Sequence, residues 1–432
     1  MSLRWVASCG LCIVTACGDD ASLIHDGGVD RDGTVDIGGD AAPSTRVTVT
    51  LDGAPASGVS VVVHDAQGLP TATLMTDVDG RVQPDVVDGA LVTIVTPAAD
   101  AVRLVTIADV HAGDDLMVPL RTNDKTTTLT AALTLSSQAG ASLYSVSTGC
   151  NTTFAGLGPY TLPITPACSS GGSYELLLAA RTSGAQIAWA HGTYATSETS
   201  PAMPAWSTAL TPYAVDLTHV PADVTSVNFY YELQLTSPGR FGLVDGSRTP
   251  TGDTVSVPVS LPTGLAGEVA AGYFARRGNG SRIVIHRLRA SGEPPSTMAL
   301  NEPALPEVAD LTLGWPSASR ARLSWTQSGT PAEGIVLRLG GEHAGTWVEW
   351  EAIVPAGASM FDFPALPAAL ADLGLVETDT SLEAAIGLVD LPGTVSAPGF
   401  RATALRWVHG WIFGYEERDP FELRVVELQL GS

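Results

Sequence analysis

Short segments in which apolar and polar residues alternate dominate the chain after residue 44. RVTVTL and VSVPVSL are two examples, and Gly, Asp and Pro residues separate such segments roughly every 8 to 12 residues. A period of two places successive side chains on opposite faces of a β-strand, one face buried and the other solvated. Charged residues make up only 16% of the 432 residues, and glycine is abundant. The pattern predicts an all-β chain of tandem β-sandwiches.

The chain after residue 121 contains an internal repeat. A strand that carries a proline precedes an alanine-rich strand three times, with Pro163, Pro258 and Pro364 in equivalent positions. A period near 95 residues is the size of one immunoglobulin-like or fibronectin type III-like sandwich, so we expect about three of them in a row. Because proline has no backbone N–H, we expect these strands at sheet edges. Each alanine-rich strand also carries a glutamate, which favours common ancestry of the repeats over a catalytic carboxylate pair: Glu175, Glu268 and Glu383.

The sandwich that precedes these repeats is expected at residues 45–121. The stretch LDGAPASGVSVVVHDAQG, followed by TDVDGRV and a closing strand after HAGDD, resembles the carboxypeptidase regulatory-like (transthyretin-like) domain. The resemblance implies a β-sandwich that serves as a structural or adhesive module without an active site. Asp77 and Asp79 could bind a metal ion, but an Asp-Gly pair between two apolar segments favours a hairpin turn.

The N-terminus has the features of an export signal. The apolar run from Trp5 to Ala16 is too short for a membrane-spanning helix, which needs about 20 residues. Val14-Thr15-Ala16-Cys17 resembles the bacterial lipobox, and the resemblance implies cleavage after residue 16 and acyl chains on Cys17. With Gly18 in the next position, it also implies an outer-membrane destination if the cell has two membranes. The alternative is an ordinary signal peptide with a chance cysteine.

An acidic linker is expected after this signal, and a pair of cysteines lies in the first repeat. Residues 17–44 are rich in Gly and Asp and offer almost nothing to a core, so we expect a flexible acidic linker. Its aspartates lack the spacing and the closing glutamate of a calcium-binding EF-hand loop. Cys150 and Cys168 form an even pair in an exported chain, which favours a disulfide over two buried thiols.

The predicted organisation follows in chain order: a signal peptide (1–16), an acidic linker (17–44), a carboxypeptidase regulatory-like sandwich (45–121) and three immunoglobulin-like or fibronectin type III-like repeats (122–214, 215–308 and 309–432). The third repeat is longer than the others. Within it, residues 365–377 carry leucines at helical spacing, so we expect a short helix or helical turn between two strands there.

Local motifs for catalysis or cofactor binding are missing from the sequence. No two of the eight histidines lie within five residues of one another, and we find no zinc motif, nucleophile elbow, P-loop or dinucleotide-binding glycine fingerprint. The net charge of −23 argues against nucleic acid as a partner, because the phosphate backbone would be repelled. We therefore expect no catalytic residue, no metal site and no cofactor.

One strand of the third repeat offers a candidate binding surface. In the segment from Trp347 to Glu351, strand spacing places Trp347, Glu349 and Glu351 on one face and Trp350 on the other. A tryptophan beside carboxylates could contact a glycan, with the sugar stacked on the ring. The competing interpretation is an ordinary sandwich strand whose tryptophans pack in the core.

These features favour a non-catalytic lipoprotein of the cell envelope. We expect a stalk of β-sandwiches that is held to a membrane by Cys17 and gives structural support or binds an envelope protein or glycan, a step that rests on analogy between folds. One alternative is an envelope enzyme that acts on polysaccharide at a domain junction. Another is an accessory subunit of an export or adhesion complex that binds through a free sheet edge.

Overall fold

The protein is all-β, as the alternating pattern predicts. The computed structural model describes residues 44–51, 54–97, 101–120, 129–149, 152–164, 169–182, 185–235, 240–265, 267–289, 297–299, 306–390 and 422–430. Within them, every regular element is a β-strand except one short 3₁₀ helix, η2 (Ala368–Leu373). That helix confirms the helical turn predicted in the third repeat. Cys17, the linker up to residue 43, and the Cys150–Cys168 pair lie outside the described residues.

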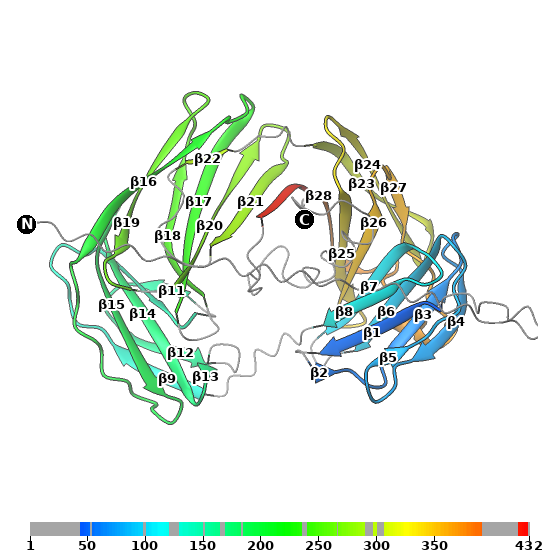
Figure 1. Ribbon diagram of the computed structural model, residues 1–432, viewed down its shortest axis with the longest axis horizontal. Coiled ribbons are helices and arrows are strands. Elements are labelled where there is room, and N and C mark those ends of the chain that lie inside the picture. The colour runs from blue at the N-terminus through cyan, green and yellow to red at the C-terminus, as the bar shows by residue number, and fades with distance from the viewer. Residues whose placement is uncertain are drawn as a thin grey trace, which may run out of the picture. The chain divides into compact units, whose positions relative to one another are not determined.

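The N-terminal sandwich, residues 44–120, packs two sheets face to face (Figure 1). One sheet is built around β1, which pairs with β2, β5 and β8; the second has the order β7-β6-β3-β4. Valine and isoleucine side chains from both sheets fill the core between them, including Val47, Val61, Ile94 and Val118. The strands are β1 (Arg46–Leu51), β2 (Ala54–Pro55), β3 (Ser60–His64), β4 (Pro70–Met75), β5 (Arg81–Val82), β6 (Ala90–Pro97), β7 (Ala101–Val110) and β8 (Asp115–Leu120).

The rest of the chain forms the same strand arrangement three times. If the two-residue β13 and the additional strand β23 are not counted, a four-stranded antiparallel row in each repeat has the order third, second, fifth and sixth strand: β11-β10-β14-β15, β18-β17-β20-β21 and β26-β25-β28-β29. In each repeat the first strand of this scheme also pairs antiparallel with the fourth: β9 with β12, β16 with β19 and β24 with β27. The internal repeat read from the sequence therefore has a counterpart in the topology, while the exact residue boundaries of the four sandwiches remain a prediction.

The strands of the three repeats have the following bounds. The first repeat contains β9 (Leu129–Thr134), β10 (Leu143–Ser147), β11 (Thr152–Ala155), β12 (Pro159–Ile164), β13 (Ser169–Ser170), β14 (Ser173–Arg181) and β15 (Gln186–Ala195). The second contains β16 (Leu210–Thr218), β17 (Val224–Gln234), β18 (Arg240–Arg248), β19 (Val255–Pro262), β20 (Glu268–Arg277), β21 (Arg282–Arg289) and β22 (Thr297–Ala299). The third contains β23 (Glu307–Ser317), β24 (Arg320–Ser328), β25 (Gly334–His343), β26 (Thr346–Pro355), β27 (Met360–Asp362), β28 (Thr380–Asp390) and β29 (Glu422–Gln429).

Two of the three repeat prolines lie on edge strands, as the missing N–H predicts. Pro163 is on β12, which pairs with β9 alone among the described strands, and Pro258 is on β19, which pairs with β16 alone. Both strands are therefore edges, and the prediction for these two residues is confirmed. Pro364 lies two residues after the end of β27 and is not on a strand, so the prediction is wrong for this residue.

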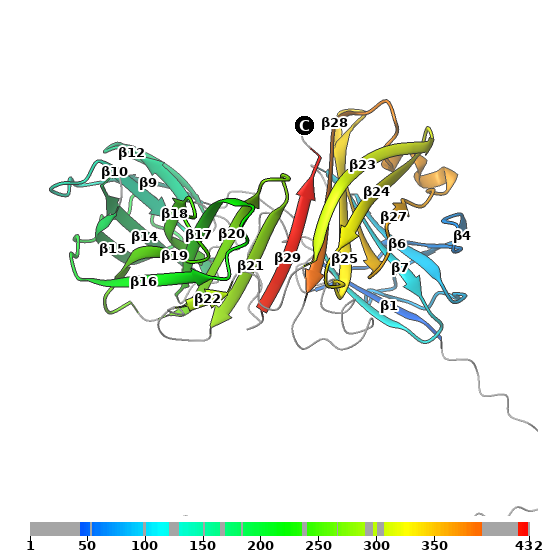
Figure 2. The same ribbon diagram turned by 90° about the horizontal axis from the view of Figure 1, so that it is seen from above.

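Two strand pairings join one sandwich to another. β21 of the second repeat pairs antiparallel with β29 of the third, and β26 of the third repeat pairs in parallel with β7 of the N-terminal sandwich. The result is one sheet of twelve described strands, β18-β17-β20-β21-β29-β28-β25-β26-β7-β6-β3-β4. Figure 2 shows β29 lying between β21 and β28. The row of independent sandwiches expected from the sequence did not include either joint.

The TDVDG segment of the N-terminal sandwich forms the turn that its Asp-Gly pair predicts. The Asp77 carboxylate accepts hydrogen bonds from the backbone N–H groups of Asp79 and Arg81, at 2.9 and 2.8 Å. Gly80 has a φ of +71°, which favours glycine. A Cβ on Gly80 would also overlap the carbonyl oxygen of Val49 on β1. The turn therefore packs too closely against β1 to accept a side chain.

We predict that Gly80→Ala destabilises the N-terminal sandwich far more than Gly58→Ala. Both glycines have positive φ, +71° and +75°, but a Cβ on Gly58 would meet no atom within 4 Å. Gly58→Ala should therefore cost about 1–2 kcal/mol from backbone strain alone, and Gly80→Ala should add a steric cost to that. Hydrogen exchange of peptides covering residues 44–97 measures the difference. Equal protection in the two variants would contradict the prediction.

Candidate functional site at the junction strand β26

Strand β26 carries the residues singled out in the sequence, and it has a hydrogen-bonded neighbour on both sides. β25 pairs with it antiparallel and β7 pairs with it in parallel, over seven register pairs from Trp347–Ala101 to Ile353–Ile107. Both edges of β26 are therefore hydrogen-bonded within a continuous sheet. The position of each side chain follows from this register.

The first face of β26 carries Trp347, Glu349 and Glu351 together, as strand spacing predicts. The Trp347 ring lies over Gly340 of the neighbouring strand, where a Cβ on that glycine would be 2.9 Å from the ring atom Cζ2. Glu349 forms an ion pair with Arg338, with 2.7 Å between Oε1 and Nε, and each of these two side chains is 19% exposed. Trp347 itself is half-buried. This face thus combines an aromatic ring with a partly accessible ion pair.

Glu351 lies deeper on the same face, only 4% exposed. Burial raises the pKa of its carboxyl well above the ordinary value, and the neighbouring Glu349 carboxylate raises it further. Arg338 and Arg103 act in the opposite direction on the pKa. The Glu351 carboxyl is thus an interior group at the boundary between the N-terminal sandwich and the third repeat, and it is not on the surface.

The opposite face of β26 carries a hydrogen-bonded chain of four buried side chains. Trp350 Nε1 donates to Thr106 Oγ1 at 2.8 Å, Thr106 Oγ1 lies 2.9 Å from Thr93 Oγ1, and Thr93 Oγ1 lies 3.0 Å from His64 Nε2. The four residues stand on adjacent strands, β26, β7, β6 and β3. Because all four are 3% exposed or less, each bond satisfies a polar group that would otherwise be buried unpaired.

His64 is the end of this chain and is fully buried. Burial lowers the pKa of its imidazole, the Asp65 carboxylate raises it and the positive charge of Arg320 lowers it, so that the resulting pKa is about 4. Its Nδ1 atom has no hydrogen-bond partner. The hairpin that follows His64 contacts the third repeat, since Ala365 N–H donates to Gly68 O at 2.9 Å and Arg320 donates to Gln67 O. Neutral His64 therefore lies beside the joint between the two sandwiches.

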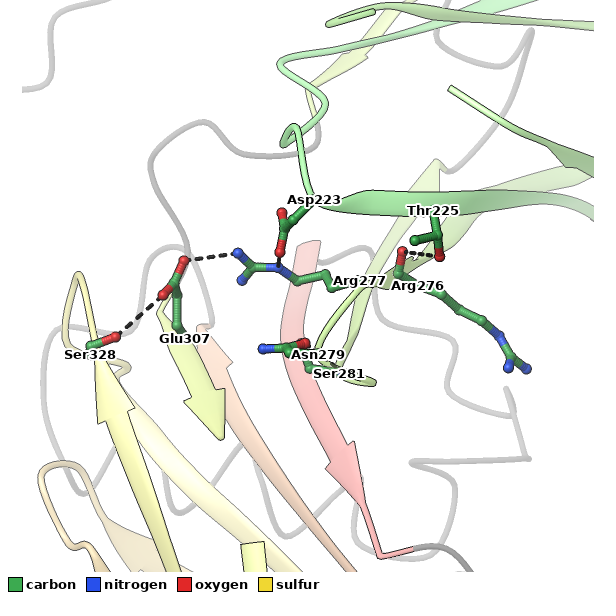
Figure 3. A network of polar contacts seen from close by, with 8 residues as sticks. All are labelled: Asp223, Thr225, Arg276, Arg277, Asn279, Ser281, Glu307 and Ser328. Carbon is green, nitrogen blue, oxygen red and sulfur yellow. Dashed lines mark hydrogen bonds and ion pairs between the residues drawn. The ribbon is translucent and has the colours of Figure 1, made fainter. Parts of the chain in front are cut away.

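A second cluster of polar side chains holds the second repeat to the third (Figure 3). Arg277, at the end of β20, donates to Asp223 at 2.7 Å and to Glu307, the first residue of β23, at 2.8 Å. Ser328 donates to the other oxygen of Glu307 at 3.4 Å. Figure 3 shows Arg277 between the two carboxylates and the Arg276 side chain pointing away from them. This arginine directly precedes the turn at Gly278-Asn279-Gly280 that joins β20 to β21.

The glutamates at equivalent repeat positions have different surroundings. All three lie on equivalent strands of their repeats, β14, β20 and β28. Glu175 is 2% exposed and lies 3.1 Å from His191 Nε2, whereas Glu383 is exposed. The described contacts therefore bring no two of these glutamates together.

Sequence reasoning missed the residues of both joints. The only signal for the buried chain is that the string LVTI occurs twice, at 91–94 and 104–107, with a threonine inside an otherwise apolar strand. His64 likewise ends an apolar strand, SVVVH. Arg277, Asp223 and Glu307 are ordinary surface-type residues, and no pattern distinguishes them. Within the described residues, no group of three or more His, Cys, Asp or Glu side chains could hold a metal ion.

Comparisons with known proteins do not assign the chain to a family. No family model matches the sequence, and no curated protein matches it. Among solved structures, the Bacillus anthracis TIE protein is similar over 60% of this chain and 49% of its own, with 12% sequence identity and a TM-score of 0.16. The chain thus spans about half the length of that protein. A similarity at this level supports no conclusion about function. No helix in the described part of the chain is long and apolar enough to cross a membrane.

We predict that the joint beside His64 weakens as the pH falls from 6.5 to about 4. In this range the unfolded chain binds a proton on His64 that the folded chain does not, so the free energy of opening decreases with falling pH. At about 1.4 kcal/mol per pKa unit, the decrease is about 3 kcal/mol across the whole range. Hydrogen exchange of peptides from β3, β6 and β7 measures it.

The matched variants separate His64 from other groups that titrate in acid. His64→Gln should remove this part of the pH dependence, whereas His219→Gln, which changes an exposed histidine, should keep it. An unchanged pH dependence in His64→Gln would show that other groups cause the effect.

We also predict that Arg277→Leu loosens the joint between the second and third repeats. The change leaves the Asp223 and Glu307 carboxylates without their shared guanidinium, at a cost of about 1–2 kcal/mol because both carboxylates are partly solvated. Faster hydrogen exchange at β20, β21 and the start of β23 would report it. Arg276→Leu is the control, since that neighbouring side chain is exposed, and it should leave exchange unchanged.

Proposed function

We propose that this protein is a non-catalytic, lipid-anchored scaffold of the cell envelope. The observation that carries the proposal is the pairing of β26 on both sides, by which the third repeat and the N-terminal sandwich share one sheet. Backbone hydrogen bonds along a full strand fix two sandwiches in one register. A chain that only needed to display independent binding modules would have no use for such a joint.

The polar residues that the fold gathers serve these joints. Arg277 binds carboxylates on both sides of the junction between the second and third repeats, and Trp350 donates across the junction between β26 and β7. The sequence also suggested that Trp347, Glu349 and Glu351 contact a glycan. This role has less support than structural support does, because Glu351 is an interior group and Glu349 is paired with Arg338. Structural support is therefore the role we favour, with an envelope protein or glycan as the partner at the far end.

The membrane is the other partner in this proposal. Its support is the resemblance of Val14-Thr15-Ala16-Cys17 to the lipobox, which would place acyl chains on Cys17. Each buried CH₂ of an acyl chain contributes about 0.8 kcal/mol, so two or three chains hold a protein firmly. The glycine at residue 18 favours the outer membrane in a cell that has two.

We predict that Cys17→Ser abolishes incorporation of a palmitate analogue and releases the protein from the membrane fraction. Cys12→Ser is the matched control, because that cysteine lies inside the apolar run and should leave with the signal peptide. Metabolic labelling followed by fractionation measures both effects. Label retained by Cys17→Ser, or label lost from Cys12→Ser, would contradict lipidation at Cys17.

A further inference from the structure

The first and last strands of the N-terminal sandwich lie side by side in parallel. β1 and β8 pair over six register positions, from Arg46–Asp115 to Leu51–Leu120. The chain enters this sandwich at the start of β1 and leaves it at the end of β8. The entry and exit points are therefore at opposite ends of one parallel strand pair.

The entry point is tied to the chain just before β8 by several bonds. Thr45 Oγ1 donates to His111 O at 3.0 Å and accepts from Gly113 N–H at 3.2 Å. Arg46 N–H donates to Asp114 O at 2.8 Å, and the Arg46 guanidinium pairs with the Asp115 carboxylate. The Thr45 side chain is buried, with 1% of the residue exposed. A force applied at residue 44 thus reaches a point that is already bonded to β8.

The second repeat uses the same arrangement. Its first strand, β16, and its last described strand, β22, pair in parallel at Asp216–Thr297, Leu217–Met298 and Thr218–Ala299. Antiparallel strand pairs outnumber parallel ones in proteins overall. Two sandwiches of one chain therefore place their terminal strands in parallel and adjacent to each other.

Parallel terminal strands change how a sandwich responds to pulling. When a chain is pulled from opposite ends of a strand pair, all the hydrogen bonds between the strands carry the load at once and must break together. When it is pulled from the same end, the bonds break one after another. The lifetime of a protein under force is set by the barrier to unfolding, so the first geometry resists longer.

We propose that this protein bears tension along its chain, with β1–β8 and β16–β22 as the latches that keep the N-terminal sandwich and the second repeat folded under load. The proposal rests on the proposed anchored scaffold, in which the membrane holds the N-terminal end. The load then enters the N-terminal sandwich at residue 44 and leaves it at the end of β8. Tension-bearing explains why the entry point, Thr45 and Arg46, carries so many bonds for an otherwise plain strand start.

Single-molecule pulling on the full mature chain, without the lipid, tests the proposal. One handle is fixed at the N-terminus and the other at an azide-bearing residue at position 130 or at position 112. Position 130 loads β1 and β8 from opposite ends, and position 112, in the exposed turn before β8, loads them from the same end. We expect a rupture force at least about two-fold higher for position 130, because six paired residues then share the load.

A pair of variants tests the entry point separately. Thr45→Val removes two side-chain hydrogen bonds and should lower the rupture force measured from position 130, while Thr73→Val, an exposed change on β4, should not. Equal rupture forces for the two handle positions would overturn the tension proposal. That result would leave the lipidation test at Cys17 unaffected, so the two proposals fail independently.

Discussion

The parallel pairing of β7 with β26 is the interaction on which the rest of the structure depends. An exposed strand edge presents unpaired N–H and C=O groups, and here each strand covers the edge of the other. The core of the N-terminal sandwich continues onto the third repeat through Val336, Ile353 and Val389, which is possible only because the two sheets are one. The buried surroundings of Glu351 follow from the same pairing. Without it, these apolar and ionisable groups would be exposed to water.

The side chains at this joint specify its register as well as its stability. A slip of β7 by one residue would turn Thr106 to the opposite face of the sheet. The indole N–H of Trp350 would then be buried without an acceptor, at a cost of about 1–3 kcal/mol. The Thr93 hydroxyl would lose its bond to Thr106 in the same step and keep only its bond to His64. A purely apolar strand face would allow such a slip at little cost, so the polar chain selects one arrangement among several close alternatives.

The sequence predicted the local structure well because the local structure depends on local physics. Alternation identified the strands, the missing N–H placed Pro163 and Pro258 on edges, and the Asp77 turn followed from its Asp-Gly pair. The joints could not be predicted in this way. A period of two says which side chains share a face but not which strand lies beside them, and β7 and β26 are separated by more than two hundred residues. The glycan surface suggested by Trp347 and Glu351 depended on that unknown neighbour, and the neighbour makes Glu351 an interior residue.

Backbone hydrogen bonds also explain how repeats with so little sequence in common keep one strand order. The four-stranded rows, the joints and the terminal strand pairs are all built from main-chain N–H and C=O groups, which every residue except proline supplies in full. The side chains need only alternate between apolar and polar and leave glycine at tight turns such as Gly80. Pairing across the sheet then imposes few demands on individual residues. The residues that do matter individually, Thr45, Trp350 and Arg277, are those where one part of the chain meets another.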